Sequence, residues 1–190
     1  MWRNTPNYYG LIHIGLHWLI ALAVLGLFAL GLWMTQLDYY SPYYRSAPDL
    51  HRSIGVLVVT AMLFRFAWKL FNPTVQPLQT HRIWELWLAH IAHALMYLLV
   101  IALGVSGYMI TTAHGQPLMI FDWFALPAIN FGIEYQEEVA GDWHERFAWG
   151  LIALVGLHLL GALKHHLIDK DSTLKRMLSY KKNPVKGDLP

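Results

Sequence analysis

Long apolar runs alternate with short polar segments along this chain. Three of the runs contain no Asp, Glu, Lys or Arg: they are Leu11–Met34, Leu86–Phe121 and Phe147–Leu163. A helix needs about 20 consecutive apolar residues to cross the hydrocarbon core of a membrane. A fourth run, His51–Phe71, is interrupted near its end by Arg65 and Lys69, whose long side chains can extend to the lipid headgroups. The pattern therefore predicts four membrane-spanning helices.

The polar segments give the bounds of these helices. We expect helices at about 11–34, 50–71, 83–110 and 142–166, with Asp49 capping the second helix. We expect the segment 111–141, which is aromatic and acidic, to be a loop. Residues 1–190 are thus predicted to form a single membrane domain, in which residues 167–190 form a basic tail.

Composition excludes several classes of protein. The chain is 56% hydrophobic and only 14% charged, so four helices leave no room for a soluble catalytic domain. It contains no cysteine. Disulfides, thiolate-bound iron–sulfur clusters and covalent haem attachment are therefore excluded, and any haem must be held by histidines and packing.

The basic residues are distributed unevenly between the two sides of the predicted bundle. Eleven of the fourteen Lys and Arg residues lie on the side of both termini, whereas Arg45, Arg52 and Arg146 lie on the other side with eight carboxylates. The positive-inside rule then places both termini in the cytoplasm. The basic tail is suited to anionic lipid headgroups, and nothing in the sequence indicates nucleic-acid binding.

The last predicted helix carries two histidines, His144 and His158, fourteen residues apart. Fourteen steps of about 100° bring both side chains to one face, and the rise separates them by roughly 21 Å. One metal ion cannot reach both, because metal–ligand bonds are only about 2 Å long. The pair therefore favours two stacked redox cofactors, and two buried histidines without a cofactor are the simpler alternative.

Depth in the membrane suggests partners for these two histidines. His51 begins the second helix on the same side as His144, and His17 lies in the first helix at the depth of His158. His93 lies at a similar depth, and spacing alone does not select between it and His17. His13 and His90 are further candidates on that side. We expect His165 and His166 to be solvated at the headgroups.

Several motifs together resemble the bacterial cytochrome b-561 family of four-helix, two-haem membrane proteins, and more distantly the cytochrome b subunits of hydrogenases and formate dehydrogenases. They are LHWL around His17, LHRSIG around His51, AHIAHALMYLLV with His90 and His93, DWHERFAW and GLHLLGALKHH with His144 and His158, and the ending IDKDSTLKRML. The resemblance implies an all-α four-helix bundle that encloses two haems b, with axial pairs His17/His158 and His51/His144.

The resemblance also implies a function and partners. It implies electron transfer in the bacterial inner membrane and exchange of electrons with ubiquinone or menaquinone, without a catalytic side chain in this chain. Arg52, Arg65, Lys69 and His93 are candidates for contacts with haem propionates or quinone; membrane anchoring explains Arg65 and Lys69 equally well. A periplasmic or membrane redox partner is a further expectation.

The sequence is compatible with three functions. The first is a quinone-linked electron carrier, which some relatives combine with superoxide oxidation. The second is an anchor subunit that relays electrons for a separate dehydrogenase or hydrogenase. The third is a metal or proton transporter that uses its histidines as relay groups. The acidic segment Glu134–Asp142 argues against attracting an anion such as superoxide.

Overall fold

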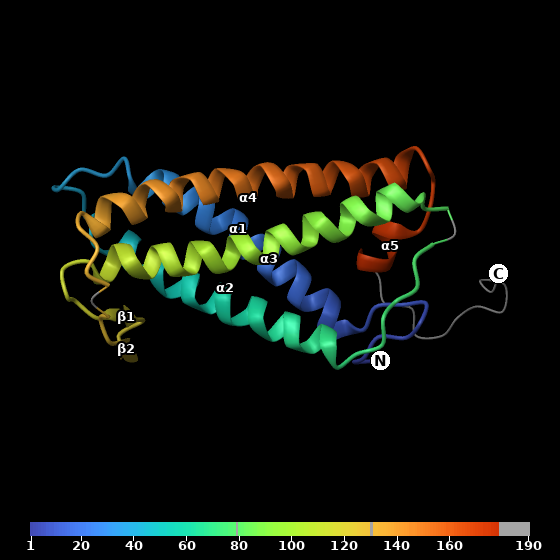
Figure 1. Ribbon diagram of the computed structural model, residues 1–190, viewed down its shortest axis with the longest axis horizontal. Coiled ribbons are helices and arrows are strands. Elements are labelled where there is room, and N and C mark those ends of the chain that lie inside the picture. Colours follow the sequence, from blue (N-terminus) through green and yellow to red (C-terminus); the bar gives the residue numbers. More distant parts are fainter. Residues whose placement is uncertain (79, 130, 179–190) are drawn as a thin grey trace.

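The computed structural model is a bundle of four long helices, described for residues 1–178 except 79 and 130 (Figure 1). The long helices are α1 (Leu11–Met34), α2 (Ser46–Leu70), α3 (Ile83–Thr112) and α4 (Gln136–Leu167). A hairpin of β1 (Leu118–Ile120) and β2 (Phe124–Leu126) connects α3 to α4, and the short helix α5 (Thr173–Leu178) follows. All four long helices are long and apolar enough to cross a membrane, which confirms the predicted fold class and a multi-pass membrane protein.

Two antiparallel helix pairs build the bundle. The most extensive contacts join α3 to α4 and α1 to α2, whereas α1 and α4 touch over a short stretch. At mid-height the four helices meet in a small core of Ile20, Val58, Met62, Val100 and Leu151. Large apolar side chains on the outer faces are exposed, as expected for helices that pack against lipid tails rather than water.

The two ends of the bundle differ, and we name them by their elements. At the hairpin end, Leu118 and Ile120 of β1 are buried, and the backbone N–H of Phe121 donates to Ser53 Oγ of α2 over 3.0 Å. At the α5 end, the N-terminal segment, the α2–α3 connection and α5 come together (Figure 1). There Trp18 Nε1 of α1 donates to the Met177 carbonyl of α5 over 2.7 Å.

Two helices begin earlier than the sequence predicts. Helix α2 starts at Ser46, so Asp49 lies within its first turn and does not cap it. Helix α4 starts at Gln136, so residues 136–141, the end of the predicted loop 111–141, belong to the first two turns of a helix. Carboxylates at a helix N-terminus are stabilised by the helix dipole, which explains why Glu137 and Glu138 continue the helix beyond its apolar part. Of the predicted basic tail, residues 179–190 lie outside the described residues.

Candidate functional site

The first candidate site is a pair of histidines near the hairpin end. His51 comes from the second turn of α2 and His144 from the third turn of α4. Their ring centroids lie 6.2 Å apart and the ring planes are inclined by 66°. Both side chains are half-buried between helices. The structure thus brings together the two histidines that share this depth in the sequence.

Two glycines and a serine, which no pattern in the sequence indicates, shape this pair. A methyl group added at Gly31 of α1 would lie 3.4 Å from His51 Cε1, and one at Gly107 of α3 would lie 3.3 Å from His144 Cε1. Each imidazole therefore rests directly on the backbone of a neighbouring helix. Ser106 Oγ donates to the Ala102 carbonyl over 2.8 Å and lies 3.0 Å from His144 Nδ1.

The contact with Ser106 orients the His144 ring. Because the serine proton is directed at a carbonyl, Ser106 Oγ is free to accept the proton of His144 Nδ1, which leaves Nε2 as the unprotonated nitrogen. The His144 ring also faces the Leu103 carbonyl, and His51 faces the Leu27 carbonyl. His51 Nδ1, however, makes no hydrogen bond of good geometry within the described residues.

A second pair of histidines lies toward the α5 end. His17 of α1 and His158 of α4 have ring centroids 6.3 Å apart, with planes inclined by 68°. His93 of α3 approaches His158 more closely, at 5.1 Å between centroids. Three helices therefore contribute one imidazole each to this end, and the core of the bundle separates the cluster from the His51/His144 pair.

Both pairs have the spacing that a shared metal ion requires. A metal–nitrogen bond of about 2.0 Å and about 1.2 Å from that nitrogen to the ring centre place two imidazoles on opposite sides of one ion roughly 6.4 Å apart. The separations of 6.2 and 6.3 Å agree with this value, whereas the 5.1 Å between His93 and His158 is too short for it. The residues present therefore fit two haems, each held by two histidines.

The basic candidates from the sequence have different surroundings. Arg52 forms an ion pair with Asp49 one turn earlier on α2. Lys69 is exposed near the end of α2. Arg65 lies between them in the sequence, and its Nη2 is 3.3 Å from His17 Nδ1. Its guanidinium lies 5.9 Å from the Tyr97 ring centre. Its Nε is buried without a hydrogen-bond partner in the described residues.

The contact between Arg65 and His17 restricts the chemistry of His17. A guanidinium only donates, so His17 Nδ1 is the acceptor here and the ring proton sits on Nε2. A metal bond at Nε2 requires that proton on Nδ1 instead. The contact and a metal at Nε2 therefore exclude each other, and Arg65 must leave His17 before Nε2 can act as a ligand.

The remaining histidines of the long helices lie outside the two pairs and differ in burial. His13 is buried and stacks on Tyr9 with ring centroids 4.6 Å apart, and burial raises the pKa of the Tyr9 phenol. His90 is exposed, and its Nδ1 lies 2.6 Å from the Leu86 carbonyl of its own helix. His165 and His166 are half-buried rather than solvated, which corrects the expectation from the sequence. The reason is that the chain after α4 folds back over the end of the bundle.

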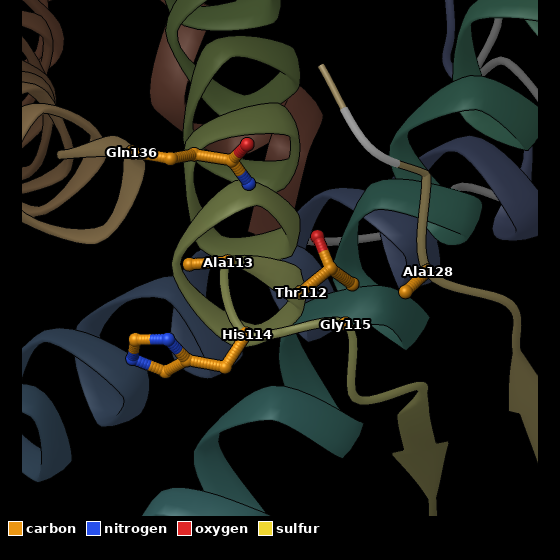
Figure 2. A pocket seen from close by; sticks show the side chains of 6 residues that line it. All are labelled: Thr112, Ala113, His114, Gly115, Ala128 and Gln136. Carbon is orange, nitrogen blue, oxygen red and sulfur yellow. The ribbon is translucent and has the colours of Figure 1, made fainter. Parts of the chain in front are cut away.

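A cavity of about 360 Å³ lies at the hairpin end, apart from the histidine pairs (Figure 2). Its lining residues are Thr112, Ala113, His114, Gly115, Ala128 and Gln136. His114 Nε2 lies at hydrogen-bond distance, 2.8 Å, from Glu137 Oε2, and Gln136 Nε2 donates to the Met109 carbonyl over 2.9 Å. These polar groups are already paired, and no candidate residue from the sequence lines the cavity.

Comparison with known proteins identifies relatives over nearly the whole chain. A family model described as prokaryotic cytochrome b561 matches residues 8–180. "Cytochrome b561 homolog 2" of Escherichia coli (strain K12) is 45% identical over 175 residues, which cover 92% of this chain and 93% of the relative. "Probable superoxide oxidase CybB" of Yersinia pestis is 29% identical, covering 92% and 97%. "Cytochrome b561 homolog 1" of Escherichia coli (strain K12) is 25% identical, covering 93% and 99%.

Gly107→Val tests whether the hairpin-end pair depends on close contact with α3. The new side chain should push His144 out of position at a cost of about 1–3 kcal/mol, since overpacking a tight site strains its neighbours. We expect a lower midpoint of thermal unfolding in detergent and less bound haem per chain. Gly26→Val is the matched control, because a Cβ added there meets nothing within 4 Å. Equal behaviour of the two variants would contradict the role assigned to Gly107.

Proposed function

This chain belongs to the prokaryotic cytochrome b561 family, and we propose that it carries electrons across the bacterial inner membrane through two haems b and exchanges them with a membrane quinone. The family implies a b-type haem. The observation that carries the proposal is the pair of His–His separations, 6.2 and 6.3 Å, both of which match two imidazoles on one iron.

Each haem has its own pair of axial ligands in this proposal. His51 and His144 hold the haem near the hairpin end, and His17 and His158 hold the haem toward the α5 end. A haem with two imidazole ligands supplies one-electron redox chemistry with no axial position open to a substrate. Since His144 and His158 are separated by roughly 21 Å of helix, the two sites span most of a hydrocarbon core of about 30 Å.

The side chains around each pair have supporting roles. Ser106 keeps the His144 proton on Nδ1 and so directs Nε2 toward the ligand position. Arg65, once released from His17, is the partner for a propionate carboxylate, because a buried guanidinium needs an acceptor for its unpaired Nε. Arg52 is less suited to that role, since Asp49 already neutralises it. Lys69 extends to the headgroups.

His93 is proposed to serve the α5-end site without binding iron. Its ring is 5.1 Å from that of His158, too close for the opposite side of a shared ion. It is therefore available to hydrogen-bond a propionate or a quinone oxygen. Exchange with ubiquinone or menaquinone is favoured by the location of both pairs in the membrane-spanning part of the bundle, which a lipid-soluble carrier can reach from the bilayer.

Superoxide oxidation is less favoured for this chain, although one relative is named a probable superoxide oxidase. At the hairpin end, Arg52 pairs with Asp49, and Arg146 lies 4.0 Å from Asp142. The additional carboxylates on that side leave a net negative surface, which repels an anion.

Purification with a soluble redox subunit would instead support the anchor-subunit alternative, and a colourless protein would support the transporter.

The haem content is the first test of the proposal. We expect about two haems b per chain in a pyridine haemochrome assay, with all haem released into acidified acetone because no cysteine can form a thioether bond. A ratio near one, or haem that stays with the protein, contradicts the proposal.

Single histidine substitutions test the axial pairs. His17→Ala and His158→Ala should alter the spectrum and potential of one haem, and His51→Ala and His144→Ala those of the other, because each loses one of two iron ligands. His93→Ala should keep both haems and slow reduction by quinol. His90→Ala is the control, since its side chain contacts only its own helix among the described contacts. Loss of the haem in His93→Ala with retention in His17→Ala would overturn the α5-end assignment.

Membrane orientation follows from the distribution of basic residues. We expect both termini in the cytoplasm, because eleven of the fourteen Lys and Arg residues belong to that side. Fusions of alkaline phosphatase and of green fluorescent protein to the C-terminus measure this. The fluorescent fusion should be active and the phosphatase fusion inactive; the reverse result rejects the orientation.

A further inference from the structure

A second kind of metal site is suggested by a cluster at the α5 end, away from both proposed haem sites. His81 precedes α3, His165 lies in the last turn of α4, and Asp171 lies in the connection to α5. One atom from each, His81 Nε2, His165 Nδ1 and an Asp171 carboxylate oxygen, lie within 4.8 Å of one another. We propose that these three side chains bind one divalent transition-metal ion of the zinc class, which joins the α2–α3 connection to the chain that follows α4.

The distances within the cluster agree with three ligands on one metal ion. His81 Nε2 and His165 Nδ1 each lie 3.3 Å from the same oxygen, Asp171 Oδ2. Ligand bonds of about 2.0 Å in tetrahedral geometry place neighbouring ligand atoms roughly 3.3 Å apart. Both separations therefore have the length of a tetrahedral edge. His81 Nε2 also lies 3.0 Å from the Thr173 hydroxyl, and this contact would give way when the nitrogen binds an ion.

His165 lacks the partner that a structural histidine would have. Its Nδ1 is buried and has no hydrogen bond of acceptable geometry within the described residues, although Asp169 Oδ2 lies 2.8 Å away. The Asp171 carboxylate is oriented from behind, because the backbone N–H of Thr173 donates to its Oδ1 over 2.8 Å. Its Oδ2, the atom that faces the two histidines, also lies 3.4 Å from the Thr80 hydroxyl. Such support of a ligand by a second hydrogen bond is typical of protein metal sites.

Charge distinguishes this cluster from its neighbour. Glu85, His165 and Asp169 are also close together, but Lys164 Nζ lies 2.5 Å from Glu85 Oε1 and 2.7 Å from Asp169 Oδ2. The lysine ammonium already supplies the positive charge there. Two histidines and one carboxylate, with Asp171 only 4% exposed in its side chain, form a donor set that zinc accepts, with water as fourth ligand.

The test uses tag-free, haem-loaded protein in detergent, so that the haem ligands do not bind the added metal. Zinc is supplied at buffered free concentrations by equilibrium dialysis, and bound metal is measured by mass spectrometry. We expect about one zinc per wild-type chain and affinity at least tenfold weaker in His81→Ala and Asp171→Asn, because each removes one of three protein ligands. His90→Ala should bind zinc as the wild type does.

The wild-type titration decides the matter even if a variant folds poorly, and the haem spectrum of each variant reports its folding. Absence of saturable zinc binding to the wild type overturns the proposal. It is equally overturned if well-folded His81→Ala and Asp171→Asn bind zinc like His90→Ala. The outcome is distinguishable from a failure of the proposed electron transfer, because the loss of zinc binding in His81→Ala and Asp171→Asn is measured against wild-type protein with the same haem content.

Discussion

The two imidazoles of α4 set the arrangement of the other helices. His144 and His158 leave one face of a continuous helix, so the partner of each must come from a helix that faces α4 at the same height. Helix α2 supplies His51 at one height and α1 supplies His17 at the other, while the bundle's small core fills the interval between them. Because a helix satisfies its backbone hydrogen bonds internally, these four helices are rigid supports that can hold such pairs in lipid.

The histidine pairs also require that imidazole rings lie close to the backbones of neighbouring helices. Gly31 and Gly107 allow the hairpin-end imidazoles to rest against α1 and α3, which bear no proposed ligand at that end. Helices that contribute no ligand thus position the rings, and Ser106 orients one of them by hydrogen bonding. Gly104 has a comparable role between helices, because a Cβ there would lie 2.7 Å from Val59 Cγ2 of α2. Small residues at helix contacts are the usual means of close packing in membranes.

The two ends of the bundle differ in their structural features. At the hairpin end, β1 of the short hairpin packs against α2, and an excess of carboxylates over arginines gives the surface its negative charge. At the α5 end, the chain after α4 returns to the bundle and brings His81, His165 and Asp171 together from three segments. A metal ion there would act on the fold rather than on electron transfer, since it would link the connection before α3 to the chain that leaves α4.

The sequence by itself determined the four helices, the membrane environment and the shared face of His144 and His158, because apolar run length and helical periodicity are local properties. The order of the histidine motifs in the sequence also indicated the family. Only the tertiary structure decided which rings meet, since packing across helices sets the 5.1 Å and 6.3 Å separations that distinguish His93 from His17. It also decided the early starts of α2 and α4, where polar first turns conceal a helix from an apolar pattern, and the contacts of His165, which depend on how the following chain folds back.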